Sequence, residues 1–250
     1  MSVAMSRSFA RAGYTVLRFD FSGIGDSEPG NDGLPPVESC LADLKDAIDW
    51  LERDRKSSRV ILIGLCSGAD HAILYGHTDP RVAALVLMDP SIPATARYYI
   101  QYIGRRLLRY RYWGSVLTAR GRILSMWIQQ LLYALRPSWK SRQITLQNLR
   151  FHNYLQECYR NAVDRGIQML AVFTGDSMRQ TYPQQMIDAF PKVAFGSQLK
   201  LELFPGSDHT FSRESDRTKL SQLILDWIDA QNYRDVPHAI EKSCDRASQG

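Results

Sequence analysis

The sequence lacks any run approaching the roughly 18 consecutive apolar residues of a membrane-spanning helix. Its first eleven residues hold Arg7 and Arg11 but no apolar block of the signal-peptide type. Internal repeats and low-complexity tracts are absent as well. Because 44% of the 250 residues are hydrophobic, the chain can bury a core of its own. We therefore expect a globular protein of one domain, with or without a large insertion, located in the cytoplasm.

Cysteine is scarce and is not paired. The four cysteines, Cys40, Cys66, Cys158 and Cys244, show neither the close spacing of a zinc site nor the density of a disulfide scaffold. No cluster of His, Cys, Asp or Glu has the spacing of metal ligands. The sequence predicts free thiols, no metal and no cofactor.

Acidic residues are absent from Ser91 to Gln156, a segment that contains eleven Arg or Lys. Since the whole chain carries a net charge of +5, the remainder carries 5 − 11 = −6. The segment is also rich in aromatics, namely Tyr98, Tyr99, Tyr102, Tyr110, Tyr112, Trp113, Trp127, Tyr133 and Trp139. We expect residues 91–165 to form a helical basic and aromatic lid that covers the carboxyl ends of the neighbouring strands.

Two interpretations of this lid stay open. Its Arg, Lys, Tyr and Trp side chains can dock on an anionic membrane surface, which would place the protein on the inner face of the membrane. Alternatively its arginines are solvated and its aromatics line a pocket for an acyl group. No recognition motif accompanies the basic residues, so nucleic acid is not an expected partner.

Short apolar runs alternate with helical periodicity along the chain, which predicts an α/β fold. Strands are expected at 14–21, 59–64, 82–89, 168–175 and 198–204, mostly apolar on both faces as in a parallel sheet covered by helices. Apolar stripes predict one helix through Leu41, Leu44, Ile48 and Leu51 and another through Leu220, Ile224, Trp227 and Ile228. The core would comprise residues 1–90 and 166–231, followed by a polar, poorly ordered tail at 232–250.

The stretch "IGLCSGAD" at 63–70 carries the strongest chemical signal. In Gly64-x-Cys66-x-Gly68 the glycines allow a strand to reverse sharply into a helix, which exposes the middle side chain at the tip. Cys66 is that residue, and the helix N-terminus favours its thiolate. Ser67 would instead offer its backbone N–H to a developing oxyanion. The alternative is that Cys66 is a small buried hydrophobe in a tight turn.

A general base and an orienting acid are expected further along the chain. His209, in "GSDHTF" after the last predicted strand, is the candidate base because it follows the nucleophile and the acid in chain order. Asp176, directly after the strand at 168–175, is the first candidate for the acid, and Asp89, which ends the strand at 82–89, is the alternative. Asp208 is expected to shape the histidine loop.

Together "RFDFSGIGDS" (18–27), "GLCSGA" (64–69), "TGD" (174–176) and "GSDHTF" (206–211) resemble the α/β-hydrolase superfamily. Within it, "LRFDFSGIGDS" with "GLCSGA" is most similar to the exosortase A system-associated hydrolases, which occur in bacteria that sort PEP-CTERM surface proteins and make exopolysaccharide. The resemblance implies an α/β-hydrolase fold with a lid and a Cys66–His209–Asp176 hydrolase or acyltransferase acting on an ester or thioester.

Members of the superfamily begin with a hairpin and a strand whose loop donates a second oxyanion N–H, and this chain starts after that point. The resemblance therefore implies that N-terminal strands are missing, one of them between the strands at 14–21 and 59–64. We expect additional N-terminal sequence in the natural protein. With one oxyanion donor fewer, the catalytic rate would fall by roughly 10²- to 10³-fold. The competing hypothesis is therefore a catalytically impaired remnant that binds a membrane surface, an acidic polymer or a partner.

Overall fold

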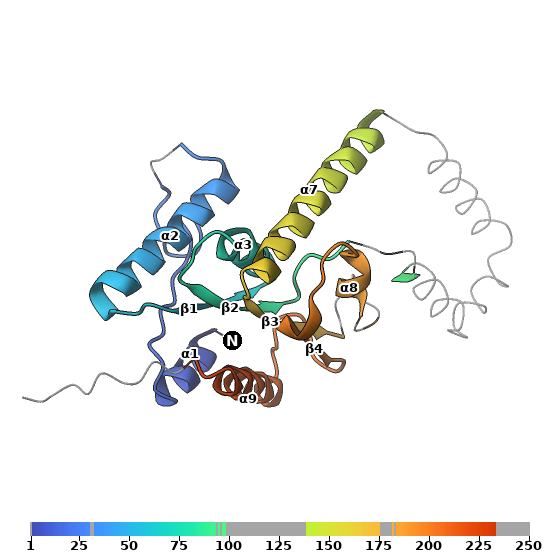
Figure 1. Cartoon of the computed structure of the whole chain (residues 1–250). Helices are drawn as coiled ribbons and strands as arrows, with labels where there is room; N and C mark the ends of the chain where they lie inside the picture. The colour runs from blue at the N-terminus through green and yellow to red at the C-terminus, as the bar shows by residue number, and fades with distance from the viewer. Residues whose placement is uncertain are drawn as a thin grey trace, which may run out of the picture.

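The computed structural model describes residues 2–30, 33–93, 95, 97–98, 139–175, 182 and 184–233, with the backbone alone for residue 2 and residues 139–149. A parallel sheet lies between two layers of helices (Figure 1). The α/β class predicted from the alternating periodicity is thereby confirmed.

The sheet contains four strands in the described part of the chain, β1 (Val60–Leu65), β2 (Val82–Met88), β3 (Gln168–Thr174) and β4 (Leu199–Phe204). They pair in the order β1-β2-β3-β4, and every pair is parallel. Four of the five predicted strands are therefore confirmed to within a residue or two. Because the strands are parallel, their carboxyl ends meet at one edge of the sheet.

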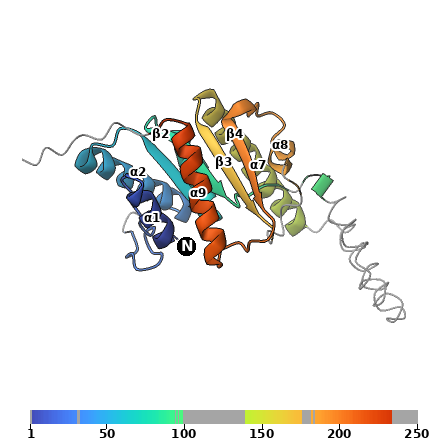
Figure 2. The same cartoon turned by 90° about the horizontal axis from the view of Figure 1, so that it is seen from below.

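Helices cover both faces of the sheet. On one face lie α2 (Pro36–Arg55), α3 (Ser67–Gly76) and α7 (Trp139–Asp164), and on the other lie α1 (Ser2–Arg11) and α9 (Glu214–Ala230) (Figures 1 and 2). The short helices α8 (Gln185–Ala189) and η1 (Gly196–Gln198) lie between β3 and β4 in the chain. This arrangement requires strands that are apolar on both faces.

The strand side chains alternate between two buried clusters, as the period of two in a strand demands. Leu85, Leu87 and Met169 point toward α2, α3 and α7. Val86 and Val172 point the other way, toward α1 and α9. The predicted stripes of α2 and α9 contribute Leu44, Ile48, Leu51, Leu220, Ile224, Trp227 and Ile228, all of which are buried, while Leu41 is partly buried.

The strand predicted at 14–21 is wrong. The segment has no regular secondary structure and pairs with no strand in the described residues, and the side chains of Val16 and Phe19 are 37% and 39% exposed. A strand needs a neighbour to satisfy its N–H and C=O groups. β1, at the edge of the described sheet, pairs with β2 alone among the described strands and not with residues 14–21. Leu17 and Phe21 still pack against the core beside α2 and α3.

Most of the segment predicted as a lid lies outside the described residues, as does the tail from residue 234 onward. The described part of α7 ends inside the core, where Leu155, Cys158, Tyr159 and Ala162 are buried. The second half of α7 therefore packs as part of the hydrolase-like core. No helix in the described ranges combines the length and apolarity that a membrane span requires.

Ion pairs hold the amino edge of the sheet. Asp79, in the turn between α3 and β2, accepts hydrogen bonds from Tyr75 Oη at 2.6 Å and from Arg81 Nη2 at 2.6 Å. Arg81 also pairs with Asp49 and Glu52 on α2 at 2.8 and 2.6 Å. The hydrogen bonds from Arg81 hold the pKa of the Asp79 carboxyl well below its usual range. This network joins α2, α3 and the start of β2.

Candidate active site

Cys66 forms the sharp turn between β1 and α3. Its backbone has φ 56° and ψ −120°, a left-handed conformation that few residues other than glycine adopt, and its side chain is exposed. Its N–H donates to Met88 O at 2.8 Å, and its carbonyl accepts from the amides of Ala69 and Asp70. The turn thus presents a thiol at the tip of a strained and firmly bonded backbone.

The two glycines of the motif differ in what they do. A Cβ at position 64 would lie 2.2 Å from Gly68 O, so Gly64 allows β1 and α3 to approach closely. At Gly68 a Cβ would meet no described heavy atom within 4 Å, and its φ is not positive. The close approach of β1 and α3 therefore requires glycine at position 64, because any larger residue there would collide with the carbonyl of Gly68.

Ser67 is the first residue of α3. The amides of a helix's first turn have no partner within the helix, and they point toward whatever lies beyond the N-terminus. The N–H of Ser67 is therefore available beside the thiol of Cys66, and α3 adds partial positive charge there.

His209 contacts Asp89. The distance from His209 Nδ1 to Asp89 Oδ2 is 2.7 Å, and the side chains are 42% and 2% exposed, respectively. An ionised carboxylate accepts hydrogen bonds and cannot donate them, so Nδ1 is the donor in this contact. Asp89 also lies close to Cys66, because the amide of Cys66 bonds to the residue before Asp89.

The carboxylate of Asp89 is held from three sides. Besides His209, it accepts the N–H of Thr174 at 2.8 Å and the hydroxyl of Thr174 at 2.6 Å. Its backbone is left-handed, with φ 45°, and its amide donates to Val172 O on β3. Asp176, the first candidate from the sequence, lies outside the described residues. We therefore take Asp89, the alternative, as the acid beside His209.

The loop that presents His209 is organised by its neighbour Asp208, as the sequence predicted. Asp208 accepts the amide and hydroxyl of Thr210 at 2.9 and 2.8 Å, and the amide and hydroxyl of Ser212. Hydrogen bonds from Ser212, then from Thr210, hold the pKa of Asp208 well below its usual range. Phe211, which is fully buried, anchors the loop in the core.

The other described histidines and thiols lie in structural surroundings. Burial lowers the pKa of His71 and of His77, and His152 bonds to Ala189 O at 2.8 Å. The thiols of Cys40 and Cys158 are buried, and burial raises the pKa of Cys158 to about 11. Cys66 is thus the exposed thiol of the described chain. Within that part of the chain, no group of three or more His, Cys, Asp or Glu is placed to hold a metal ion.

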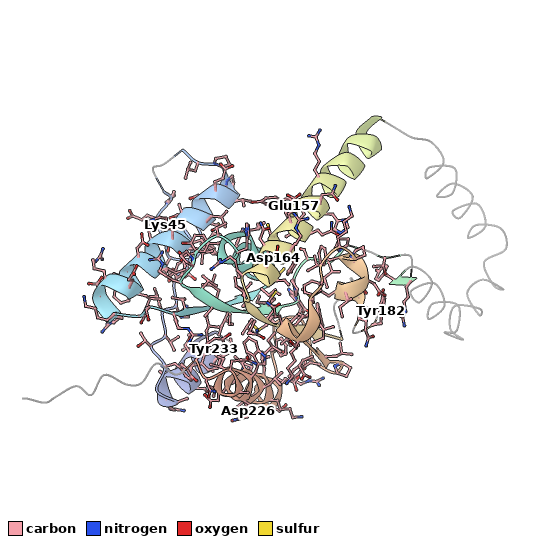
Figure 3. All side chains as sticks on the ribbon, in the orientation of Figure 1. Lys45, Glu157, Asp164, Tyr182, Asp226 and Tyr233 are labelled. Carbon is pink, nitrogen blue, oxygen red and sulfur yellow. The ribbon has the colours of Figure 1, made fainter. Side chains whose placement is uncertain are left out.

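The segments that leave β2 and β3 are tied together near this edge. Tyr182, labelled in Figure 3 on the side of α8, bonds to Thr95 Oγ1 at 2.8 Å and to Asp188 Oδ2 at 2.7 Å. The guanidinium of Arg97 lies over its ring, 4.5 Å from the centroid. These contacts tie the chain that follows β2 to the chain that follows β3.

Sequence reasoning missed two groups that hold the site. Thr174 donates twice to Asp89, and its only sequence signal is a hydroxyl at the end of a predicted strand. The second is the pair formed by Asp70 and Ser91, in which Ser91 N–H and Oγ donate to Asp70 at 2.8 and 2.6 Å. Both are visible only when β1, β2 and β3 are side by side.

A family model described as Serine aminopeptidase, S33, matches residues 3–216. The mouse alpha/beta hydrolase domain-containing protein 10 has a similar structure, with a TM-score of 0.52 and 16% identity over 92% of this chain and 84% of that one. This likeness shows the α/β-hydrolase fold.

Two curated proteins match shorter stretches. Quorum-quenching protein AidA from Acinetobacter baumannii is 33% identical over 35% of this chain and 29% of its own length. Polyketide transferase grgF from a Penicillium species is 32% identical over 36% of this chain and 32% of its own length. The chain thus spans about a third or less of the curated relatives that it matches.

Proposed function

Because the chain belongs to the Serine aminopeptidase, S33 family of α/β-hydrolases, we propose that it transfers an acyl group from an ester or thioester through an acyl-cysteine intermediate on Cys66. One observation carries the proposal above the others. An exposed thiol lies in a strained turn, and the residue bonded to its amide directly precedes an aspartate that orients a histidine. A structural cysteine needs none of these neighbours.

In the first half-reaction His209 Nε2 takes the proton of Cys66, and the sulfur attacks the carbonyl carbon of the substrate. The carbonyl electrons move onto oxygen, and the Ser67 N–H donates to the oxyanion. When the C=O bond reforms, the bond to the alcohol or thiol breaks, and His209 returns its proton to that leaving group. The products are the free alcohol or thiol and a thioester on Cys66.

In the second half-reaction His209 removes a proton from the acceptor, which attacks the acyl-cysteine. The tetrahedral oxyanion again faces the Ser67 N–H, and its collapse expels the Cys66 thiolate, which His209 reprotonates. Throughout, Asp89 keeps Nδ1 protonated and stabilises the imidazolium that forms at each half-reaction. Thr174 keeps that carboxylate in place through its N–H and its hydroxyl.

The acceptor decides between hydrolysis, in which it is water, and acyl transfer, in which it is an alcohol, amine or sugar hydroxyl. We favour acyl transfer because the Cys66 thiolate is a good leaving group when an alcohol, amine or sugar hydroxyl attacks the thioester intermediate. The partial likeness to a protein named polyketide transferase supports this choice.

The test is acyl trapping followed by mass spectrometry. Purified protein is mixed with p-nitrophenyl acetate, p-nitrophenyl octanoate and acetyl coenzyme A, and peptides are mapped for an acyl group. The expected result is an adduct on Cys66, lost in Cys66→Ala and retained in Ser67→Ala, which keeps the backbone N–H. Cys66→Ala should also lower turnover by roughly 10³-fold or more.

Ser67→Ala is the matched control, because it changes the neighbouring nucleophilic side chain in the same turn. An adduct on Ser67, or turnover that survives Cys66→Ala but not Ser67→Ala, would overturn the assignment. Equal adduct yields in wild type and His209→Ala would remove His209 from the mechanism.

A further inference from the structure

Asp70 links the helix that follows the proposed nucleophile to the loop that carries the proposed acid. It lies in the first turn of α3, where its amide donates to Cys66 O at 3.1 Å. Its carboxylate accepts the Ser91 N–H at 2.8 Å and the Ser91 hydroxyl at 2.6 Å. Ser91 comes two residues after Asp89, so the contact joins the two halves of the candidate site.

The loop needs such a contact because Asp89 is strained. Its φ of 45° is a backbone conformation that residues other than glycine rarely adopt, and the surrounding structure must enforce it. On the amino side the amide of Asp89 is bonded to Val172 O on β3. On the carboxyl side the next side chain bonded to a neighbouring element is that of Ser91.

We propose that Asp70 is a positioning residue, which holds Ser91 and thereby keeps the carboxylate of Asp89, and with it His209, in place opposite Cys66. This inference rests on the proposed function, since it assigns how that site is held. Asp70 acts through the loop and does not touch the reacting atoms.

The charge of Asp70 alone would have the opposite effect, and this separates the two roles. A carboxylate in the first turn of α3 disfavours a thiolate on Cys66. If charge were its role, Asp70→Asn would make Cys66 more reactive. If positioning is its role, Asp70→Asn displaces Asp89 and His209 and makes Cys66 less reactive.

The chain contains a matched control. Asp43 on α2 accepts the N–H and the hydroxyl of Ser22 at 2.7 and 2.8 Å. The chemistry is the same as that of Asp70 and Ser91, but the loop at 20–27 holds no member of the proposed triad. Asp43→Asn and Ser22→Ala therefore reproduce the loss of such a contact without touching the site.

The experiment measures the rate at which iodoacetamide alkylates Cys66, by peptide mass spectrometry, together with kcat and KM for p-nitrophenyl acetate. The variants are Asp70→Asn, Ser91→Ala, the double variant, Asp43→Asn, Ser22→Ala and His209→Ala. Unfolding is followed for each, so that rates are compared well below the melting temperature.

We expect Asp70→Asn to lower kcat by roughly 10- to 100-fold, since a displacement of about 1 Å has this effect, with KM changed less than about twofold. Ser91→Ala should have a smaller effect of the same kind, because its N–H still donates. The double variant should be no worse than Asp70→Asn, since both act through one contact. Asp43→Asn and Ser22→Ala should leave kcat at the wild-type value.

Faster alkylation in Asp70→Asn, or a kcat equal to that of Asp43→Asn, would overturn the positioning role. The His209→Ala variant separates this failure from failure of the proposed function. If His209→Ala slows alkylation and Asp70→Asn does not, the triad stands and the inference about Asp70 fails. If His209→Ala leaves alkylation unchanged, the proposed function itself fails.

Discussion

Two loops of this chain are held by the same pair of hydrogen bonds and differ in what they carry. Ser22 bonds to Asp43 on α2, and Ser91 bonds to Asp70 on α3, each through its N–H and its hydroxyl. The first loop follows the segment 14–21, which pairs with no described strand. The second follows β2, which is paired on both sides and almost wholly buried.

The loops also differ in which residues take the left-handed conformation. In the loop at 20–27 these are Gly23 and Gly25, with φ 74° and 62°. Around the candidate site they are Cys66, Asp89 and Phe211, with φ 56°, 45° and 51°. Where a loop needs only its shape, glycine supplies it without strain. At Cys66 and Asp89, the proposed nucleophile and acid, the strained conformation is held by hydrogen bonds to the neighbouring strands.

Replacing one aspartate of each loop, Asp89 or Asp20, with asparagine should give the largest difference in kcat/KM between the two loops. Asp89→Asn should lower kcat/KM by roughly 10³- to 10⁴-fold, because an amide can donate to Nδ1 and so favours the tautomer that leaves Nε2 protonated. Asp20→Asn should change it less than about twofold, as surface substitutions do. Initial rates with p-nitrophenyl esters measure both. Similar losses in the two variants would show that the loops are functionally alike.

Alanine at a glycine should be more harmful beside Cys66 than in the loop at 20–27. A Cβ at position 64 would lie 2.2 Å from the backbone of Gly68, whereas at position 25 it would lie 2.6 Å from the movable carboxylate of Asp20. We expect Gly64→Ala to lower the free energy of unfolding by about 3 kcal/mol. Gly25→Ala should lower it by about 1 kcal/mol, because of its left-handed φ.

Urea unfolding followed by circular dichroism measures both free energies. Gly68→Ala is the control for Gly64→Ala, since its Cβ would meet no described heavy atom within 4 Å. An equal loss in Gly64→Ala and Gly68→Ala would contradict the close-approach argument.

The smallest expected effect is a change in the free energy of unfolding that has opposite signs at Cys66 and at Gly23. Cys66→Gly removes an exposed side chain and relieves about 1–3 kcal/mol of strain, offset by the about 0.5–1 kcal/mol that glycine loses in chain entropy. The free energy of unfolding should therefore rise by about 1 kcal/mol while acyl transfer disappears. Gly23→Ala should lower it by about 1 kcal/mol with activity retained. A destabilised Cys66→Gly would mean that the turn holds no strain.

Sequence periodicity predicted the strands that have neighbours and failed at the one that does not. The runs that became β1 to β4 are apolar, and each found a partner. The run at 14–21 is also mostly apolar, but strand formation depends on a hydrogen-bonding neighbour, which no local pattern in the run itself can specify. Its exposed Val16 and Phe19 are the result.

The turn motif and the chain order predicted only part of the candidate site. Cys66 and His209 follow from the turn motif and from the loop after the last strand. Asp89 and Asp176 both follow strands. The sequence favoured Asp176, which lies outside the described residues, and the contact with His209 supports the alternative, Asp89. Thr174 and the contact of Asp70 with Ser91 depend on strands brought together from distant parts of the chain, and no local pattern announces them.

The left-handed backbone at position 66 also restricts how this site can change by mutation. A β-branched residue such as threonine is a genuine outlier at positive φ, which leaves serine and cysteine as the small nucleophiles that the turn accepts. Their codons can differ by a single base, and the side chains differ by one atom. A lineage carrying this turn could therefore exchange oxygen for sulfur in one mutational step, altering the reactivity of the acyl intermediate while the fold stays the same.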